Sequence, residues 1–398
     1  MDFRFTADEN VFREEIQSFL KQELPKNWAG GDWISEDDDE RRKDGELSLS
    51  RTIRSKLARK GWLTLAWPSE YGGMGASHMK QLVFNEEMAY QGAPGGGGSG
   101  VAMLGPTLML YGSEDQKREH LPRIARAEVE WCQGYSEPES GSDLASLQTS
   151  AVEDGDDYVI NGTKSWTSGA RHADWIFFLA RTDPNAPKHR GISFFVANMK
   201  SPGITVRPIR NMAGVSGFNE TVFDNVRVPK RNLVGERNRG WYYGATLLDF
   251  ERSGVQRPAR AKRVLDDLVA LAKSRSLSGR RLAGDPIFRN RLGAMAAEIE
   301  ACRLMCYRVA WMQSQGELPN KEASIVKVFS TEMMQHLYNL VIHASGLQGL
   351  LLPGSRLALQ NGKIARNWLS SFSATIAAGT SEIQRNIIAN RGLGLPRG

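Results

Sequence analysis

One loop of this chain gathers hydroxyl groups and tight-turn residues that could bind a phosphorylated ligand. Residues 135–143 read Tyr-Ser-Glu-Pro-Glu-Ser-Gly-Ser-Asp, with hydroxyls at Ser136 and Ser142. Hydroxyls and free backbone N–H groups in such a loop can bind the oxygens of a ring or of a pyrophosphate. The same residue types are also ordinary turn formers. The segment alone therefore does not decide between a binding loop and a plain turn.

Cysteine spacing offers a weaker hint of chemistry. Cys302 and Cys306 lie four residues apart, which places them on one face of a helix. A zinc site would need two more ligands nearby, and the sequence offers no such cluster. Three cysteines are also too few for a disulfide framework. We expect buried, reduced thiols and no metal.

Composition sets the broad class of the protein. The 398 residues, of which 41% are hydrophobic, are enough for two or three domains, and the net charge is +6. Positive charge could attract a polyanionic ligand or could be a mildly basic surface, and charge alone does not separate these. Nothing in the pattern indicates nucleic-acid binding. No run of about 18 apolar residues suggests a membrane span, and the first residues lack a secretion signal. We expect a cytoplasmic protein.

The first third of the chain has helical patterns. Thr6 and Glu9 form a Thr-x-x-Glu capping box, and apolar residues then follow one helical face until Pro25 ends the helix. Further helices are expected over residues 49–60 and 77–91.

Between about residues 130 and 233 the pattern changes to strands. Asn161-Gly162 lies between two β-prone runs, 158–160 and 163–166, and this dipeptide is typical of a type I′ hairpin turn. Four more strands are expected at 175–179, 192–196, 204–206 and 220–226. These segments predict a compact antiparallel β-domain.

After Gly240 the helical period returns, and the sequence predicts helices at 264–271, 292–309, 323–340 and 380–389. Helices, then strands, then helices indicate an α+β chain with segregated parts. We expect three domains: an N-terminal helical domain at 1–122, a middle β-domain at 123–236 and a C-terminal helical bundle at 237–398.

Five segments, in this order along the chain, resemble the signatures of the acyl-CoA dehydrogenase family. They are the Ser-Glu-Pro loop at 135–143, Lys-Ser-Trp-Thr-Ser-Gly at 164–169, Gly-Arg-Arg-Leu-Ala-Gly-Asp-Pro-Ile at 279–287, His-Ala-Ser-Gly-Leu-Gln-Gly at 343–349 and Ala-Ala-Gly-Thr-Ser-Glu-Ile-Gln-Arg at 377–385. The resemblance covers essentially the whole chain. It implies an N-terminal helical domain, a middle antiparallel β-barrel and a C-terminal four-helix bundle.

The resemblance also implies FAD as the cofactor. Ser136 and Ser142 match residues that bind the flavin, Trp166 matches the residue that packs against its ring, and the Ser168 hydroxyl matches a group near flavin N5. A guanidinium suits phosphate oxygens, so Arg280 is the expected pyrophosphate contact. The other implied cofactor contacts are His343, Gly346, Thr380 and Glu382.

The catalytic base is not where this family commonly keeps it. The closing signature commonly reads Tyr-Glu-Gly-Thr, and here Ala378 stands in place of that Glu. Some family members carry the base in the first helix of the bundle, where this chain reads Leu-Asp-Phe-Glu-Arg. We therefore expect Glu251 to be the base, although the same residues also occur at plain, solvated helix starts. Asp249 and Arg252, with Ser142, match residues near the substrate.

Ala378 retains a backbone N–H, which in the family donates to the thioester carbonyl. The resemblance implies α,β-desaturation of an acyl-CoA and electron transfer to an electron-transfer flavoprotein. It further implies a homotetramer, or a heterotetramer with a related chain. His343 and Ala283 replace a Gln and a Phe of the family, which motivates a second hypothesis of a heteromeric enzyme with shared flavin sites. A non-catalytic acyl-CoA binder and an oxidase or monooxygenase stay open.

Overall fold

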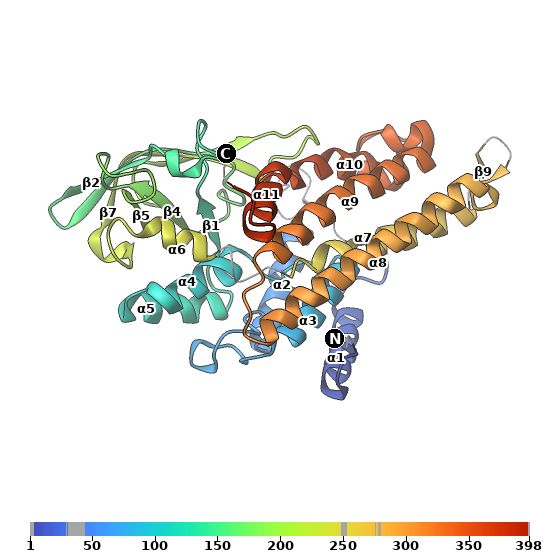
Figure 1. The fold of residues 1–398 in the computed structure, drawn as a ribbon, viewed down its shortest axis with the longest axis horizontal. Helices are drawn as coiled ribbons and strands as arrows, with labels where there is room; N and C mark the ends of the chain where they lie inside the picture. Colours follow the sequence, from blue (N-terminus) through green and yellow to red (C-terminus); the bar gives the residue numbers. More distant parts are fainter. Residues whose placement is uncertain are drawn as a thin grey trace. The chain divides into compact units, whose positions relative to one another are not determined.

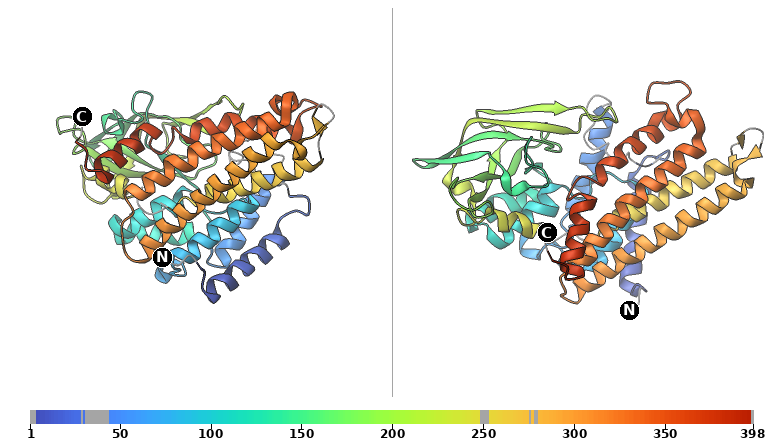
Figure 2. Two further views of the ribbon diagram at one scale, coloured as in Figure 1. Left: turned by 45° about the vertical axis from the view of Figure 1, so that its right-hand side comes forward. Right: turned by 45° about the horizontal axis from the view of Figure 1, so that its top comes forward.

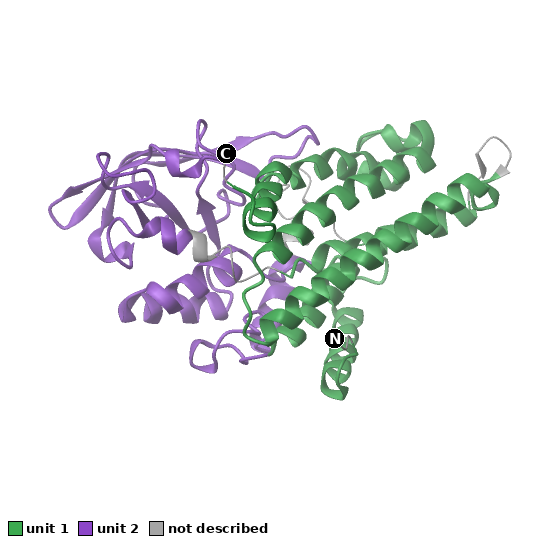
Figure 3. Ribbon diagram, viewed as in Figure 1, with its two compact units in different colours: residues 1–34, 77–93, 252–398 green, residues 35–76, 94–251 purple. Residues whose placement is uncertain are grey.

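The computed structural model describes residues 4–28, 30, 44–247, 253–274, 276–277 and 280–396. The chain divides into two compact units, each built from separate stretches of sequence (Figure 3). Unit 1 comprises Met1–Ile34, Ser77–Ala93 and Arg252–Gly398, and unit 2 comprises Ser35–Ala76 and Pro94–Glu251.

Unit 1 is helical. Its helices are α1 (Ala7–Glu23), α3 (His78–Gln91), α7 (Gln256–Ser274), α8 (Pro286–Ser314), α9 (Lys321–Ser345), α10 (Lys363–Ala374) and α11 (Ser381–Ile387), with a short β9–β10 pair (Ser276–Leu277 and Arg280–Arg281). Figures 1 and 2 show α7, α8 and α9 running side by side in each view. The predicted bundle helices at 264–271, 292–309 and 323–340 are confirmed within these longer elements.

The apolar faces of these helices make one continuous core. Leu268 of α7, Ile299 of α8 and Leu337 of α9 are among its members, and each is at most 3% exposed. A buried Leu or Ile of this kind contributes about 1.5–3 kcal/mol. Cys302 and Cys306 lie in the same core as free thiols, as predicted.

A buried polar cluster joins α1 to α3 and α8. The Arg13 guanidinium donates to Glu86 at 2.8 Å and to Glu87 at 2.5 Å, and the Tyr307 hydroxyl donates to Glu86 at 2.7 Å. The predicted Thr6–Glu9 capping box starts α1 with both of its hydrogen bonds in place.

Unit 2 contains a sheet with short helices. Its helices are α2 (Asp44–Arg59), α4 (Gly105–Tyr111), α5 (Glu114–Ala125) and α6 (Gly240–Leu247). Its strands are β1 (Trp131–Gly134), β2 (Ser150–Asp154), β3 (Asp157–Lys164), β4 (Trp175–Arg181), β5 (Ile192–Asn198), β6 (Ile204–Ile209), β7 (Phe218–Pro229) and β8 (Leu233–Val234). The strands follow the order β6-β7-β3-β2-β4-β5-β8, with β1 beside β4.

The sheet is mixed, which corrects the prediction of a purely antiparallel domain. Neighbours such as β4 and β5 are antiparallel, but β4 runs parallel to β1 and to β2. Parallel neighbours cannot be joined by a tight hairpin and need a longer connection. Between β1 and its parallel neighbour β4 the chain runs through residues 135–174, which include β2 and β3.

The predicted hairpin turn at Asn161-Gly162 is wrong, because β3 continues through it. The turn joining β2 to β3 lies instead at Gly155, whose φ is +60°. Gly162 marks an irregularity in the pairing of β3 with β7. A Cβ there would lie 2.5 Å from the Thr149 hydroxyl, so glycine is required for close approach rather than for a turn.

Helix α10 has no counterpart among the predicted helices. Its sequence is amphipathic, and its buried residues include Ser370 and Ser371 beside Ile364 and Ala365. Within the described part of the chain, no helix is long and apolar enough to cross a bilayer.

Candidate active site

The Ser-Glu-Pro loop leaves β1 and is closed by its own backbone. Glu137 and Ser140 exchange hydrogen bonds through their N–H and carbonyl groups at 3.0 and 3.1 Å, and the Ser140 hydroxyl donates to the Asp143 carbonyl at 3.0 Å. Ser142 is exposed and Ser136 is half-buried. The loop is thus fixed internally while the Ser142 hydroxyl remains open to a ligand.

A buried ion pair lies directly behind this loop. The Lys164 ammonium donates to the Glu137 carboxylate at 2.7 Å, and their side chains are 0% and 6% exposed. Burial opposes ionisation of Glu137, but Lys164 and two backbone N–H groups outweigh it and hold the pKa of the carboxyl below its usual range. Burial lowers the pKa of Lys164 to about 8, because attraction to Glu137 offsets only part of the desolvation. Both groups are therefore charged at neutral pH.

Trp166 follows β3 in an uncommon conformation. Its φ is +61°, in the left-handed region, and its side chain is 57% exposed, with an edge contact to the Phe218 ring. The neighbouring Thr167 is fully buried, donates its N–H to the Asn219 carbonyl at 2.9 Å and accepts from the Asn219 amide at 3.0 Å. A rigid turn therefore presents a bare indole ring. Ser168, two residues on, is also exposed.

In unit 1, the closing segment makes a sharp turn before α11. Ala378 and Gly379 both lie in the left-handed region, with φ of +54° and +83°. The Gln384 side chain donates to the Ala378 carbonyl at 3.1 Å and fixes the turn. Among the residues that the structure describes, the N–H groups of Ala378 and Gly379 donate to no acceptor. Because Ala378 is exposed, its N–H is available to a ligand.

Thr380 and Glu382 shape the start of α11. The Thr380 hydroxyl accepts from the N–H of Ile383 at 3.2 Å as the N-cap. The backbone N–H of Glu382 and then the Thr380 hydroxyl hold the pKa of the exposed Glu382 carboxyl below its usual range. Both residues border a surface hollow that also contains the Glu332–Arg385 ion pair at 2.7 Å.

The remaining predicted cofactor contacts lie elsewhere on unit 1. His343 is exposed near the end of α9, and Gly346 ends that helix with φ of +59° and its N–H bonded to the His343 carbonyl. Arg280 pairs with Leu277 through its backbone in the β9–β10 ladder, and its side chain is outside the described part. Asp249, Glu251 and Arg252 lie outside the described residues.

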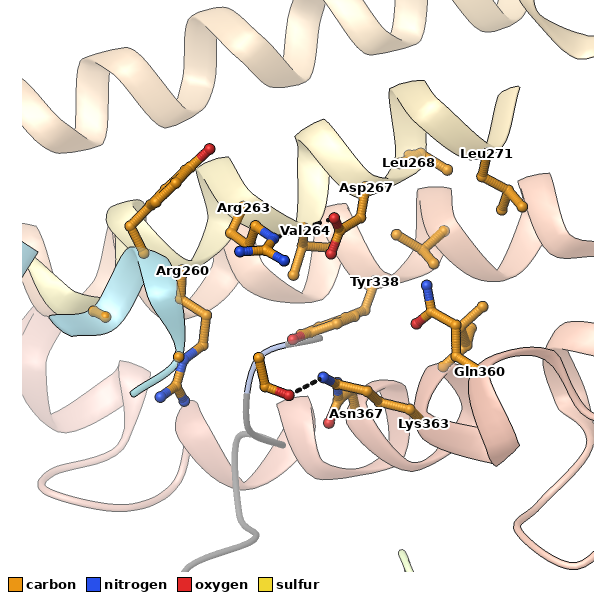
Figure 4. A pocket seen from close by; sticks show the side chains of 16 residues that line it. Arg260, Arg263, Val264, Asp267, Leu268, Leu271, Tyr338, Gln360, Lys363 and Asn367 are labelled. Carbon is orange, nitrogen blue, oxygen red and sulfur yellow. Dashed lines mark hydrogen bonds and ion pairs between the residues drawn. The ribbon is translucent and has the colours of Figure 1, made fainter. Parts of the chain in front are cut away.

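A separate cavity in unit 1 contains none of the predicted site residues. Figure 4 shows it between α7, α9 and α10, with Arg260 and Arg263 on one side, Lys363 on the other and the Tyr338 ring between them. Arg263 is paired with Asp267 at 3.2 Å. The cavity volume of about 60 Å³ is room for a few water molecules and not for a flavin or an acyl chain.

Family comparison identifies the class of protein. The chain matches the acyl-CoA dehydrogenase N-terminal domain at residues 6–128, the middle domain at 132–226 and the C-terminal domain at 238–393. The chain therefore belongs to the acyl-CoA dehydrogenase family. The expected fold class is confirmed, and the protein is an FAD-dependent oxidoreductase of this family.

The chain is also similar to individual members of the family along nearly its whole length. Acyl-CoA dehydrogenase FadE26 of Mycobacterium tuberculosis is 39% identical over 369 residues, which cover 89% of this chain and 90% of the relative. Two solved structures cover both chains fully at a TM-score of 0.87: the Tcur3481-Tcur3483 steroid ACAD, at 35% identity, and the ChsE4-ChsE5 complex from Mycobacterium tuberculosis, at 36%.

The residues of each unit fit FAD. Unit 2 offers a bare Trp166 ring for a flat ligand and the exposed hydroxyls of Ser142 and Ser168. Unit 1 offers the exposed side chains of His343 and Glu382. Bound FAD would supply a two-electron acceptor.

Glu137 and Lys164 lie within two of the family-like segments, but the sequence analysis predicts no role for either residue. One signal was present. Lys164 shares the buried face of β3 with Tyr158 and Ile160, where an unpaired charge would be costly. A lysine at such a position calls for an acidic partner, and Glu137 is that partner.

Proposed function

We propose that this protein catalyses the α,β-desaturation of an acyl-CoA thioester, with Glu251 as the base. The observation that carries the proposal is the conformation of Ala378. Its methyl group cannot take a proton, yet its left-handed turn leaves an exposed N–H that no described residue uses. The closing loop thus retains a hydrogen-bond donor for the substrate and needs a carboxylate from another segment.

The two residues have complementary tasks. The Glu251 carboxylate takes the proton from Cα of the substrate, acting as a general base. Negative charge then develops on the thioester oxygen. The Ala378 N–H donates to that oxygen, and one such donor is typically worth about 3–4 kcal/mol. Bound FAD would supply the acceptor for the hydride that leaves Cβ as the double bond forms.

A bulky acyl group, such as a steroid side chain, is the proposed substrate class. Ala377, Ala378 and Gly379 leave small side chains along the closing loop. The solved Tcur3481-Tcur3483 protein is described as a steroid ACAD, and it shares 35% identity with this chain over its full length. A screen of acyl-CoA thioesters with straight, branched and ring-bearing chains, followed by flavin absorbance, would identify the preferred class.

The proposed electron acceptor is an electron-transfer flavoprotein. A relative that is 28% identical over 386 residues is named as a subunit of a caffeyl-CoA reductase-Etf complex. Reduced enzyme should pass electrons to an electron-transfer flavoprotein and react slowly with air. Rapid reoxidation by oxygen would favour the oxidase alternative instead.

The base assignment is tested by Glu251→Gln. This variant should retain FAD and lose turnover by at least about a thousandfold, because the amide cannot accept the proton. Glu300→Gln, on the exposed face of α8 beside Arg303, is the matched control and should retain full turnover. Normal activity in Glu251→Gln would refute the assignment.

A heteromeric enzyme is the second candidate. His343 and Ala283 depart from the family pattern, and two of the related solved structures are named for two gene products. In this arrangement a related chain completes the flavin site.

A non-catalytic acyl-CoA binder is a further alternative. Failure of acyl-CoA to bleach the flavin, in a protein with full FAD, would favour it.

A further inference from the structure

The loop after β1 and the turn after β3 in unit 2 come from separate parts of the sequence and meet at one place. Ser136 belongs to the loop after β1, and Trp166 follows the end of β3, 30 residues later. The N–H of Ser165 donates to the Ser136 carbonyl at 2.8 Å. The Lys164 ammonium donates to Glu137 at 2.7 Å and also reaches the Tyr135 carbonyl at 3.3 Å.

The Glu137 carboxylate accepts hydrogen bonds at both of its oxygens. One oxygen accepts from Lys164 and from the N–H of Thr149 at 2.9 Å, and the other accepts from the N–H of Gln148 at 2.6 Å. The carboxylate therefore connects three segments: its own loop, the end of β3 and the start of β2. Gly134 makes room for this arrangement, because a Cβ there would lie 3.2 Å from Lys164 Cγ.

Stability alone does not account for the pair. A buried ion pair is commonly no better than an apolar pair of equal volume, because both charges lose their water. What the pair supplies is a fixed geometry. Trp166, two residues after Lys164, stays in a left-handed conformation that a bulky residue avoids, and such strain persists only where the surroundings over-determine it.

We propose that Glu137 and Lys164 are positioning residues for FAD, and that their ion pair holds the Ser136 loop and the Trp166 turn in the register that binds the flavin. This inference rests on the cofactor contacts proposed for Ser136 and Trp166. It assigns neither charge a part in proton or hydride transfer.

The test is FAD binding to apoprotein, measured by fluorescence titration and by the visible circular dichroism of the flavin. Glu137→Gln and Lys164→Met should each weaken FAD binding at least tenfold and reduce the dichroism, at temperatures where the protein is folded. Glu86→Gln is the matched control. It also removes a buried, hydrogen-bonded carboxylate, but one in unit 1 that holds Tyr307, so FAD affinity should change less than twofold.

A variant that leaves one buried charge unpaired could fail to fold. The double variant Glu137→Gln/Lys164→Met removes both charges and keeps the volume, so it should fold and still bind FAD more than tenfold more weakly. FAD affinity within twofold of the unmutated protein in the folded variants would overturn the proposal. An equal loss in Glu86→Gln would overturn it as well. FAD binding needs no turnover, so an error in the Glu251 assignment would leave this result unchanged.

Discussion

Trp166 and Ala378 occupy left-handed backbone conformations although neither is glycine. Each such residue costs about 1–2 kcal/mol relative to its ordinary conformations. Strain of this kind tends to gather at functional sites. At Trp166 the conformation accompanies a bare ring, and at Ala378 it accompanies an unused N–H group. In both places the backbone conformation exposes the group that could contact a ligand.

Substitutions at Ala378 should distinguish the contribution of its N–H group from that of its methyl group. Ala378→Gly keeps the N–H and relieves the strain, so turnover should stay within about threefold. Ala378→Val should lower the free energy of unfolding by about 1–2 kcal/mol and reduce turnover, because a β-branched residue resists positive φ. Ala377→Val, at a neighbour without positive φ, should change stability by less than about 0.5 kcal/mol. Equal effects at both positions, by urea unfolding and turnover assay, would contradict this account.

The sequence identified most candidate residues but not their conformations. Ser142, Trp166 and Thr380 could be chosen from short signatures that match the family. The left-handed turn at Trp166 could not be predicted, because local propensity disfavours it and only the surrounding hydrogen bonds hold it. The role of Glu137 was missed because its partner Lys164 lies 27 residues away.

At the scale of elements, long helices with a clear apolar face were the most predictable. α9 has many fully buried Leu, Met and Val residues at helical spacing, and its prediction is confirmed. α10 was not predicted, although its sequence is amphipathic. Asn161-Gly162 misled the strand prediction because a close approach to Thr149, rather than a turn, requires the glycine.

Glu137 accepts hydrogen bonds from β3 and from the residues before β2. These bonds also predict how the free energy of unfolding depends on pH. The pKa of Glu137 is lower in the folded protein than in the unfolded chain, where a glutamate has a pKa of about 4.3. Its contribution is therefore complete above about pH 5 and is lost as the pH falls through the lower folded-state value. Glu137→Gln should remove this part of the acid sensitivity below about pH 5, measured by urea unfolding at a series of pH values. An unchanged pH profile would mean that the carboxyl is not ionised in the folded state.

At the scale of the whole molecule, the candidate cofactor residues are divided between the two units. Ser136 and Trp166 belong to unit 2, whereas His343 and Thr380 belong to unit 1. The departures from the family pattern at His343 and Ala283 motivate the hypothesis that a related chain completes the flavin site.

The flavin content of the purified protein tests directly whether this chain alone forms a complete flavin site. If the chain forms a homotetramer with complete sites, protein purified alone should carry about one FAD per chain, by flavin absorbance against protein concentration and by mass in solution. A heteromeric enzyme would give a nearly colourless protein that becomes yellow when expressed together with a related chain. Full FAD in a homo-oligomer would contradict the heteromeric hypothesis.

The central claim is that Glu251 removes the α-proton, since Ala378 cannot. The most direct measurement is anaerobic mixing of FAD-loaded protein with a steroid-side-chain acyl-CoA while the flavin absorbance is followed through a single turnover. The account predicts rapid bleaching in the unmutated protein and in Glu300→Gln, and no bleaching in Glu251→Gln with its FAD still bound. Bleaching at the normal rate in Glu251→Gln would contradict the claim.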